Sequence, residues 1–249
     1  MSNSKLVDYT EISPNQSGER NHNIDRITPH SVVGQMSVES LGHWFAKKST
    51  QASSNYGIGF DGRVGLYVPE SHRSWCSSSG ENDNRAVTIE CACDPKYPYT
   101  FNKAVYKTLV DLCVDICKRN GKTKLIWFNN KEKTLAYKPK SNEMLLSIHK
   151  WFGNTTCPNK WMLDHMDDLE KAVNKRLQSR YMIQFGCFKN KDNASRLVRV
   201  LAGHGYNCSI VKDDGYYCVR YGKFKSKTKA EKMKESVTDE GYKTIIIRE

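Results

Sequence analysis

The sequence predicts an α/β protein of two units: a larger one of mixed strands and helices, and a small one with the order βαββαβ. Apolar side chains alternate with polar ones at strand spacing in residues 87–92, and they recur at helical spacing in 101–116. The pattern starts afresh at Tyr181, and 249 residues suffice for two unequal domains. We therefore expect a polar lead-in at 1–22, a first domain at 23–178 and a second domain at 181–249.

The first part of the larger unit is predicted to hold a short helix and several short strands. The first twenty residues are polar and rich in Ser and Asn, so we expect them to be poorly ordered. A helix is expected after Ser37, a suitable N-cap that precedes apolar residues at helical intervals. Asp61-Gly62 between two short apolar runs predicts a hairpin. Alternation in 87–92 makes Glu90 point away from its apolar neighbours.

The second part of this unit continues with helices and strands in turn. Residues 100–120 predict an amphipathic helix that is capped by Thr100, stops at Gly121 and packs its apolar stripe on the sheet. A strand is expected at 124–128, followed by a basic loop. A short apolar stretch then ends at His149, and a helix over 160–177 completes the unit.

The C-terminal segment divides into six pieces after Tyr181. Their order is strand, helix, strand, strand, helix, strand. This is the order of a split-βαβ, ferredoxin-like module, and about seventy residues suffice for it.

The charge of the chain indicates a polyanionic partner. The formal net charge is +12, of which residues 179–249 contribute +7. Nucleic acid, an anionic membrane surface and a bacterial wall rich in teichoic acid and carboxylates all fit such a charge. Composition alone does not choose among them.

The number of cysteines and the N-terminal residues indicate in which cellular compartment the protein is made. The nine cysteines are odd in number and scattered, so we expect reduced thiols or metal ligation rather than a disulfide framework. The start of the chain lacks a secretory signal, and no apolar run is long enough to span a membrane. We therefore expect synthesis in the cytoplasm and no membrane insertion.

Two histidines and one cysteine could form a metal site. His149 and Cys157 stand eight positions apart, and His30 lies far upstream. Two imidazoles and one thiolate suit a catalytic zinc ion, whose fourth position stays open for water. An amide hydrolase also needs a carboxylate that takes and returns protons, and Glu90 is our candidate.

Four segments carry a resemblance to a known family. TPHSVVGQMSVESLGHWFA, SSNYGIGFDGRVGLYV, SWCSSSGENDNRAVTIE and HKWFGNTTCP resemble the zinc N-acetylmuramoyl-L-alanine amidases of the phage lysozyme and peptidoglycan-recognition-protein family, above all phage endolysins. The resemblance runs from about His30 to about Leu177. It implies a central mixed sheet flanked by helices, Zn2+ held by His30, His149 and Cys157, and Glu90 as the acid/base.

The same resemblance implies further site residues. Thr155, two positions before the cysteine, would offer its hydroxyl to the developing oxyanion. The catalytic tyrosine of other members has no clear counterpart, because Ser54 stands seven positions before the Asp61-Gly62 turn and Tyr56 follows two positions further on. The expected substrate contacts are Asn84, Trp75 and Ser77.

The last seventy residues resemble a SPOR domain, a family of βαββαβ modules that bind peptidoglycan glycan strands. YMIQFGCFKNKDNASRL and YYCVRYGKFKSKTKAEKMKE match its doubled pattern of an aromatic residue, Gly, any residue, Phe and a helix with Ala. Aromatic side chains on its sheet would stack against sugar faces. The expected glycan-binding residues are Gln184, Phe185, Tyr217, Arg220 and Tyr221.

The sequence thus predicts a peptidoglycan hydrolase, an endolysin or autolysin that acts on a Gram-positive type of wall after release from the cytoplasm. Two alternatives remain open. A recognition protein of the same family could bind peptidoglycan without cutting it, although Cys157 favours the hydrolase. A basic nucleic-acid-binding protein would fit the βαββαβ order and the positive tail, but the first strand of that module lacks the aromatic RNA-binding signature. We therefore expect no nucleic-acid partner.

Overall fold

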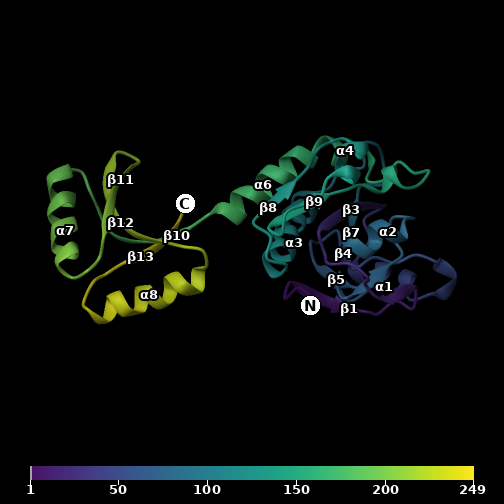
Figure 1. The fold of residues 1–249 in the computed structure, drawn as a ribbon, viewed down its shortest axis with the longest axis horizontal. Helices are drawn as coiled ribbons and strands as arrows, with labels where there is room; N and C mark the ends of the chain where they lie inside the picture. The colour runs from purple at the N-terminus through teal and green to yellow at the C-terminus, as the bar shows by residue number, and fades with distance from the viewer. Residues whose placement is uncertain (1) are drawn as a thin grey trace. The chain divides into compact units, whose positions relative to one another are not determined.

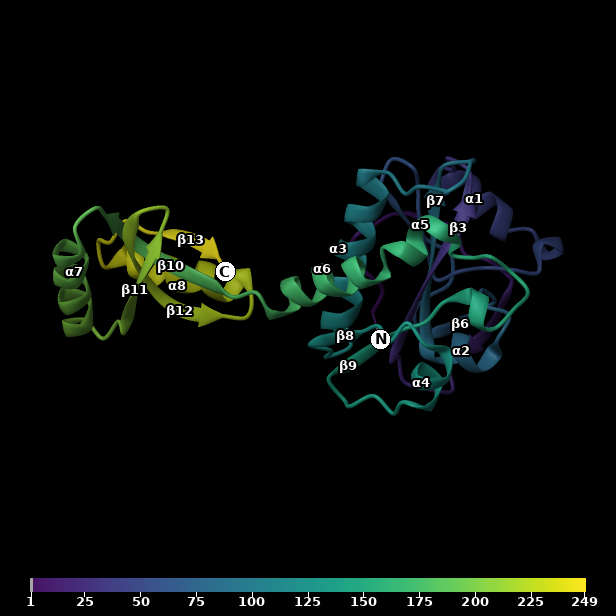
Figure 2. The same cartoon turned by 90° about the horizontal axis from the view of Figure 1, so that it is seen from above.

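The computed structural model describes residues 2–249, which form two compact units, one up to Leu177 and one from Gln178 to Glu249 (Figures 1 and 2). Each unit contains its own sheet and its own apolar core. Within 2–249 no helix is long and apolar enough to cross a membrane.

The first unit is built on a seven-stranded mixed sheet in the order β1-β5-β4-β7-β3-β9-β8. Only the hairpin pair β4–β5 is antiparallel; the other neighbours run parallel. A separate pair of strands joins β2 to β6. The strands are β1 (Val7–Thr10), β2 (Gln16–Glu19), β3 (Arg26–Val33), β4 (Tyr56–Ile58), β5 (Val64–Leu66), β6 (His72–Ser74), β7 (Ala86–Cys93), β8 (Lys124–Ile126) and β9 (Glu143–Leu146).

Helices flank this sheet, as predicted. They are α1 (Val38–Phe45), α2 (Gly80–Arg85), α3 (Lys103–Arg119), α4 (Lys131–Ala136), α5 (Asn159–Asp164) and α6 (Met166–Gln178), with short 3-10 turns at Lys48–Thr50 and His149–Trp151. α3 begins at the N-cap Asn102, whose side chain accepts a hydrogen bond from Val105 N, rather than at Thr100. The helix expected over 160–177 is two helices, because α5 ends at His165. The basic loop contains α4.

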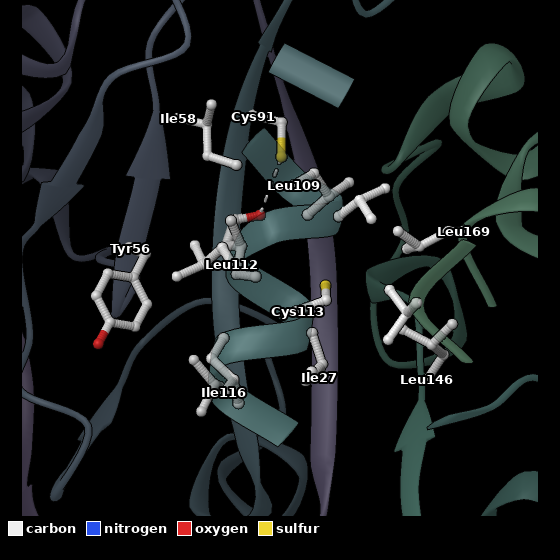
Figure 3. Close-up of a cluster of buried hydrophobic side chains, with 14 of the residues drawn as sticks. Ile27, Tyr56, Ile58, Cys91, Leu109, Leu112, Cys113, Ile116, Leu146 and Leu169 are labelled. Atoms are coloured by element: carbon white, nitrogen blue, oxygen red, sulfur yellow. Dashed lines mark hydrogen bonds between the residues drawn. The ribbon is translucent and has the colours of Figure 1, made fainter. Parts of the chain in front are cut away.

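The core lies between the sheet and the helices α3 and α6 (Figure 3). Ile27 and Cys91 face this core from β3 and β7, and Leu109 and Leu112 meet them from α3; all four are fully buried. Because side chains alternate along a strand, the even-numbered residues of β3 and β7 face the other way. That second face carries the polar groups, including His30.

The N-terminal lead-in is ordered, which corrects the sequence-based expectation. β1 pairs with β5, and β2 pairs with β6. The stabilising contacts come from buried polar groups: Ser13 Oγ and Asn15 Nδ2 both donate hydrogen bonds to the carbonyl of Phe45. A polar segment can therefore be fixed by hydrogen bonds to backbone groups that lie far along the chain.

The second unit has the predicted βαββαβ order. Its four-stranded antiparallel sheet runs β11-β12-β10-β13, and both helices pack on one face of it. The elements are β10 (Tyr181–Phe188), α7 (Lys191–Gly203), β11 (Cys208–Asp213), β12 (Tyr216–Phe224), α8 (Lys227–Asp239) and β13 (Ile245–Arg248).

A disulfide joins two strands of the second unit, which corrects the expectation of reduced thiols at these two cysteines. Cys187 on β10 and Cys218 on β12 stand directly opposite each other in the strand register and are bonded. The pairing depends on strand register, which the spacing of cysteines in the sequence does not reveal. Cys91, Cys93, Cys113 and Cys117 are free and buried in the core of the first unit, as small apolar side chains are.

Candidate functional site

Two histidines and a cysteine meet beside β3, an interior strand of the first sheet. His30 lies on β3, and His149 follows the end of β9, the parallel neighbour of β3. Cys157 lies eight residues beyond His149, and its Sγ is 3.4 Å from His30 Nδ1. One donor atom from each residue lies within 4.8 Å of the others. The predicted trio is therefore brought together and can hold a metal ion.

The chemistry of these donors suits a metal ion. His30 is fully buried, and its Nε2 has no hydrogen-bond partner among residues 2–249. Burial, helped by the neighbouring His149, lowers the pKa of His30 well below its ordinary value. His30 is therefore neutral, which is the form that ligates metals. Burial also raises the pKa of Cys157, so metal binding there would displace the thiol proton.

Glu90 adjoins this group, as the alternation on its strand predicts. It stands opposite His30 in the register of β3 and β7, and its Oε1 is 3.8 Å from His30 Nδ1. Its other oxygen, Oε2, is buried and has no hydrogen-bond partner within the described chain. Burial raises the pKa of Glu90 to about 7. The carboxyl group thus lies beside the possible metal position with one oxygen unengaged.

Cys76 also lies at this position, and the sequence analysis did not single it out. Its Sγ is 3.9 Å from Glu90 Oε1, and with His30 and Glu90 it forms a second trio of donor atoms within 4.8 Å of one another. Burial raises its pKa well above the ordinary value for a thiol. Its place directly after Trp75, an expected substrate contact, was the signal available in the sequence.

An open hollow of about 410 Å³ leads to His149. Trp75, one of the expected substrate contacts, is in its wall. The complete lining consists of Gln51, Ala52, Arg73, Trp75, Cys76, Ser78, Ser79, Gly80, Asp83 and His149. A bound chain could approach the metal position from this side.

Two expected substrate contacts have structural roles instead. Ser77 is fully buried, and its hydroxyl donates a 2.6 Å hydrogen bond to Asp83 Oδ1. Asn84 Nδ2 donates to the carbonyl of Gly80 within α2, while its Oδ1 accepts from Asn21 N. The hydrogen bonds of both side chains stabilise the segment around α2, and neither residue lines the hollow.

Neither candidate for the missing tyrosine is available to a substrate. Tyr56 is fully buried and donates its hydroxyl proton to Glu70 Oε1 at 2.6 Å. Ser54 is buried too and donates a hydrogen bond to the carbonyl of Tyr56.

Thr155 lies in the loop before Cys157, where its Oγ1 accepts a 3.1 Å hydrogen bond from Cys157 N. Thr155 therefore helps to hold the cysteine in place.

The expected glycan-binding residues of the second unit divide between the two faces of its sheet. Phe185, Tyr217 and Tyr221 pack against the core beneath the helices. Gln184 and Arg220 line a hollow of about 610 Å³ on the opposite face, where Arg220 Nε donates to Gln184 Oε1 at 3.1 Å. The three aromatic rings are therefore directed into the core, which corrects their expected role in stacking on sugars.

Comparison with protein families assigns both units. Residues 19–160 match N-acetylmuramoyl-L-alanine amidase, and residues 177–248 match the SPOR domain. The chain belongs to the N-acetylmuramoyl-L-alanine amidase family and carries a C-terminal SPOR domain. The resemblances found in the sequence are thereby confirmed: the protein is a peptidoglycan hydrolase with a wall-binding SPOR domain.

Solved structures of wall-degrading enzymes are similar to parts of this chain. A mutant endolysin from Bacillus subtilis is 15% identical over 67% of this chain and 99% of its own, with a TM-score of 0.49. The N-acetylmuramoyl-L-alanine amidase LysC from Clostridium intestinale is 14% identical over 67% and 97%, with a TM-score of 0.46. The peptidoglycan-binding domain of the B. subtilis cell wall lytic enzyme CwlC is 32% identical over 28% and 90%, with a TM-score of 0.27. A comparison with curated proteins found no match.

Proposed function

We propose that the first unit is a zinc-dependent amidase that cleaves the bond between the lactyl group of N-acetylmuramic acid and L-alanine. The observation that carries this proposal is the convergence of His30, His149 and Cys157, whose donor atoms lie within 4.8 Å of one another. Two imidazoles and a thiolate with one position open form the donor set of a catalytic zinc site. When bound, zinc would supply an activated water and polarise the scissile carbonyl.

Glu90 is the group that moves the proton in this proposal. It is fixed on a central strand beside His30, and its Oε2 makes no hydrogen bond to any described residue. The carboxylate would accept the proton of the attacking water and return it to the nitrogen of the departing L-alanine. Thr155 Oγ1 accepts a hydrogen bond from Cys157 N, so its O–H would be the group that donates a hydrogen bond to the developing oxyanion.

The geometry favours cleavage over recognition without cleavage. Cys157 supplies the third donor atom, and Glu90 adjoins it with an unengaged oxygen. A protein that only binds peptidoglycan needs neither group. Trp75, in the wall of the hollow that leads to His149, would contact the substrate near the scissile bond.

The second unit would hold the enzyme on the glycan. Gln184 and Arg220 present polar groups on the helix-free face of the sheet, and the unit is strongly basic. Tethering one module to the polymer raises the local concentration of the other at the same polymer. Attraction to anionic wall polymers would add to this effect.

We further propose that the protein acts on a Gram-positive type of wall as an endolysin or a mother-cell autolysin. It would be made in the cytoplasm and reach the wall after release, for example through a phage-made membrane hole. The net charge of +12 supports attraction to a wall rich in teichoic acid.

Digestion of purified walls tests the amidase proposal. The protein should release free N-terminal alanine, and removal of zinc with a chelator should abolish that release until zinc is restored. The control is the variant Cys157→Ser, which should release no alanine with or without added zinc. Release of reducing sugar ends without alanine would refute the assigned bond, and full activity in the chelator would refute zinc dependence.

A further inference from the structure

We infer that Ser78 is a positioning residue for the metal site: its hydroxyl accepts a hydrogen bond from Nε2–H of His149 and leaves Nδ1 of that ring to bind the metal. Ser78 Oγ lies 3.2 Å from His149 Nε2. The inference rests on the proposed metal site and adds to it a residue that selects the tautomer of one ligand.

Ser78 is held in an unusual backbone conformation by its two neighbours. Its φ is 59°, in the left-handed region that residues other than glycine seldom adopt. Ser77 before it is anchored to Asp83 through both its backbone N–H and its hydroxyl. Ser79 after it caps α2, accepting a hydrogen bond from Asn82 N. Such conformations persist where the surroundings enforce them and are concentrated at functional sites.

Ser78 and Gly153 lie beside the Nε2 side of the His149 ring, where the Ser78 hydroxyl is exposed to solvent. A Cβ added to Gly153 would lie 3.4 Å from His149 Nε2 and 3.4 Å from Ser78 Oγ. No described residue forms a hydrogen bond to Nδ1 of His149. In the His149 ring, Nε2 therefore contacts Ser78, whereas Nδ1 has no hydrogen-bond partner among the described residues.

His30 shares the direction of Nδ1 with this arrangement but has no counterpart of Ser78 among the described residues. His30 presents Nδ1 to Cys157 Sγ at 3.4 Å and to Glu90 Oε1 at 3.8 Å, while its Nε2 is buried and has no hydrogen-bond partner within residues 2–249. Nδ1 is thus the atom of His30 on the side of the donor cluster. Using Nδ1 of both rings would give the two imidazoles a common orientation toward the cluster.

The chemistry of imidazole links the hydrogen bond to metal binding. A neutral imidazole carries one N–H and one lone pair, and the partner at one nitrogen decides which nitrogen has the lone pair. Histidines that bind metals commonly donate the other N–H to an acceptor, and loss of that acceptor lowers metal affinity about 10- to 100-fold. The Ser78 hydroxyl can act as this acceptor for His149.

Zinc affinity, measured by competition with a chelator in the full chain, tests the inference. Ser78→Ala and Ser78→Gly should each weaken zinc binding about 10- to 100-fold. Ser78→Gly should keep or raise Tm, because glycine adopts positive φ without strain. Ser78→Asp should retain the affinity, because a carboxylate accepts the Nε2 proton as the hydroxyl does. Asn129→Gly, at another residue with positive φ (49°), is the control that relaxes backbone strain away from the metal.

A spectroscopic measurement reports the tautomer directly. In ¹⁵N spectra of the zinc-free protein, His149 should carry its proton on Nε2, and Ser78→Ala should reduce that preference. Unchanged zinc affinity in Ser78→Ala and Ser78→Gly, or a proton on Nδ1 in the wild type, would overturn the role of Ser78 while the zinc proposal stands. A wild-type protein that binds no zinc would overturn both.

Discussion

Replacing Glu90 by glutamine removes the proposed proton carrier while keeping the shape of its side chain. The amide would occupy the same place beside His30 and Cys76, but it cannot accept a proton from water. General acid–base catalysis contributes about 10²- to 10⁴-fold to rate. At about 1.4 kcal/mol per factor of ten, Glu90→Gln should therefore raise the activation barrier by about 3–5 kcal/mol.

The assay is the initial rate of alanine release from purified walls, accompanied by zinc content and thermal unfolding. Glu90→Gln should keep its zinc, and its Tm should fall only modestly, since one buried amide group lacks a partner. Glu132→Gln, at an exposed position on α4, is the matched control and should keep the full rate. A rate loss below tenfold in a folded, zinc-loaded Glu90→Gln protein would refute the role of Glu90.

Three further perturbations test the core, a buried ion pair and the wall contact. Leu109→Ala, at a fully buried position on α3, should lower the free energy of unfolding in urea by about 2–5 kcal/mol; a loss below 1 would contradict its packing. Glu70→Ala leaves Arg119 and Tyr56 without their buried partner and should cost about 3–5 kcal/mol by the same measurement, which Glu132→Ala should not. Wall binding in pelleting assays should weaken about tenfold or more between low and high salt; a salt-independent result would contradict electrostatic attraction.

Predictions made from the residue pattern of a single helix, strand or turn agree with the structure. Alternation on β7 correctly directs Glu90 away from the core, and the Asp61-Gly62 turn joins β4 to β5. The βαββαβ order of the second unit also follows from local periodicity. These features depend on residues that are close in sequence, where side-chain period and turn chemistry act directly.

Features that depend on contacts between segments far apart in the sequence could not be predicted from local patterns. Alternation on β12 places Tyr217 and Tyr221 on one face, but the sequence does not say that α7 and α8 cover that face. The family resemblance placed Ser77 in the site, whereas the structure has the next residue, Ser78, with a positive φ and its hydroxyl beside His149. The Cys187–Cys218 bond likewise depends on the register of two strands.

The four residues around the proposed metal position come from two different kinds of structural element. His30 and Glu90 belong to adjacent central strands, whereas His149 and Cys157 belong to one connecting segment after β9. An ion bound by both kinds of group would fasten that segment to the sheet, so ion binding and local ordering would be thermodynamically coupled. Amide protons of residues 149–157 should therefore exchange with solvent more slowly as free zinc rises, and those of β3 and β7 should be little affected.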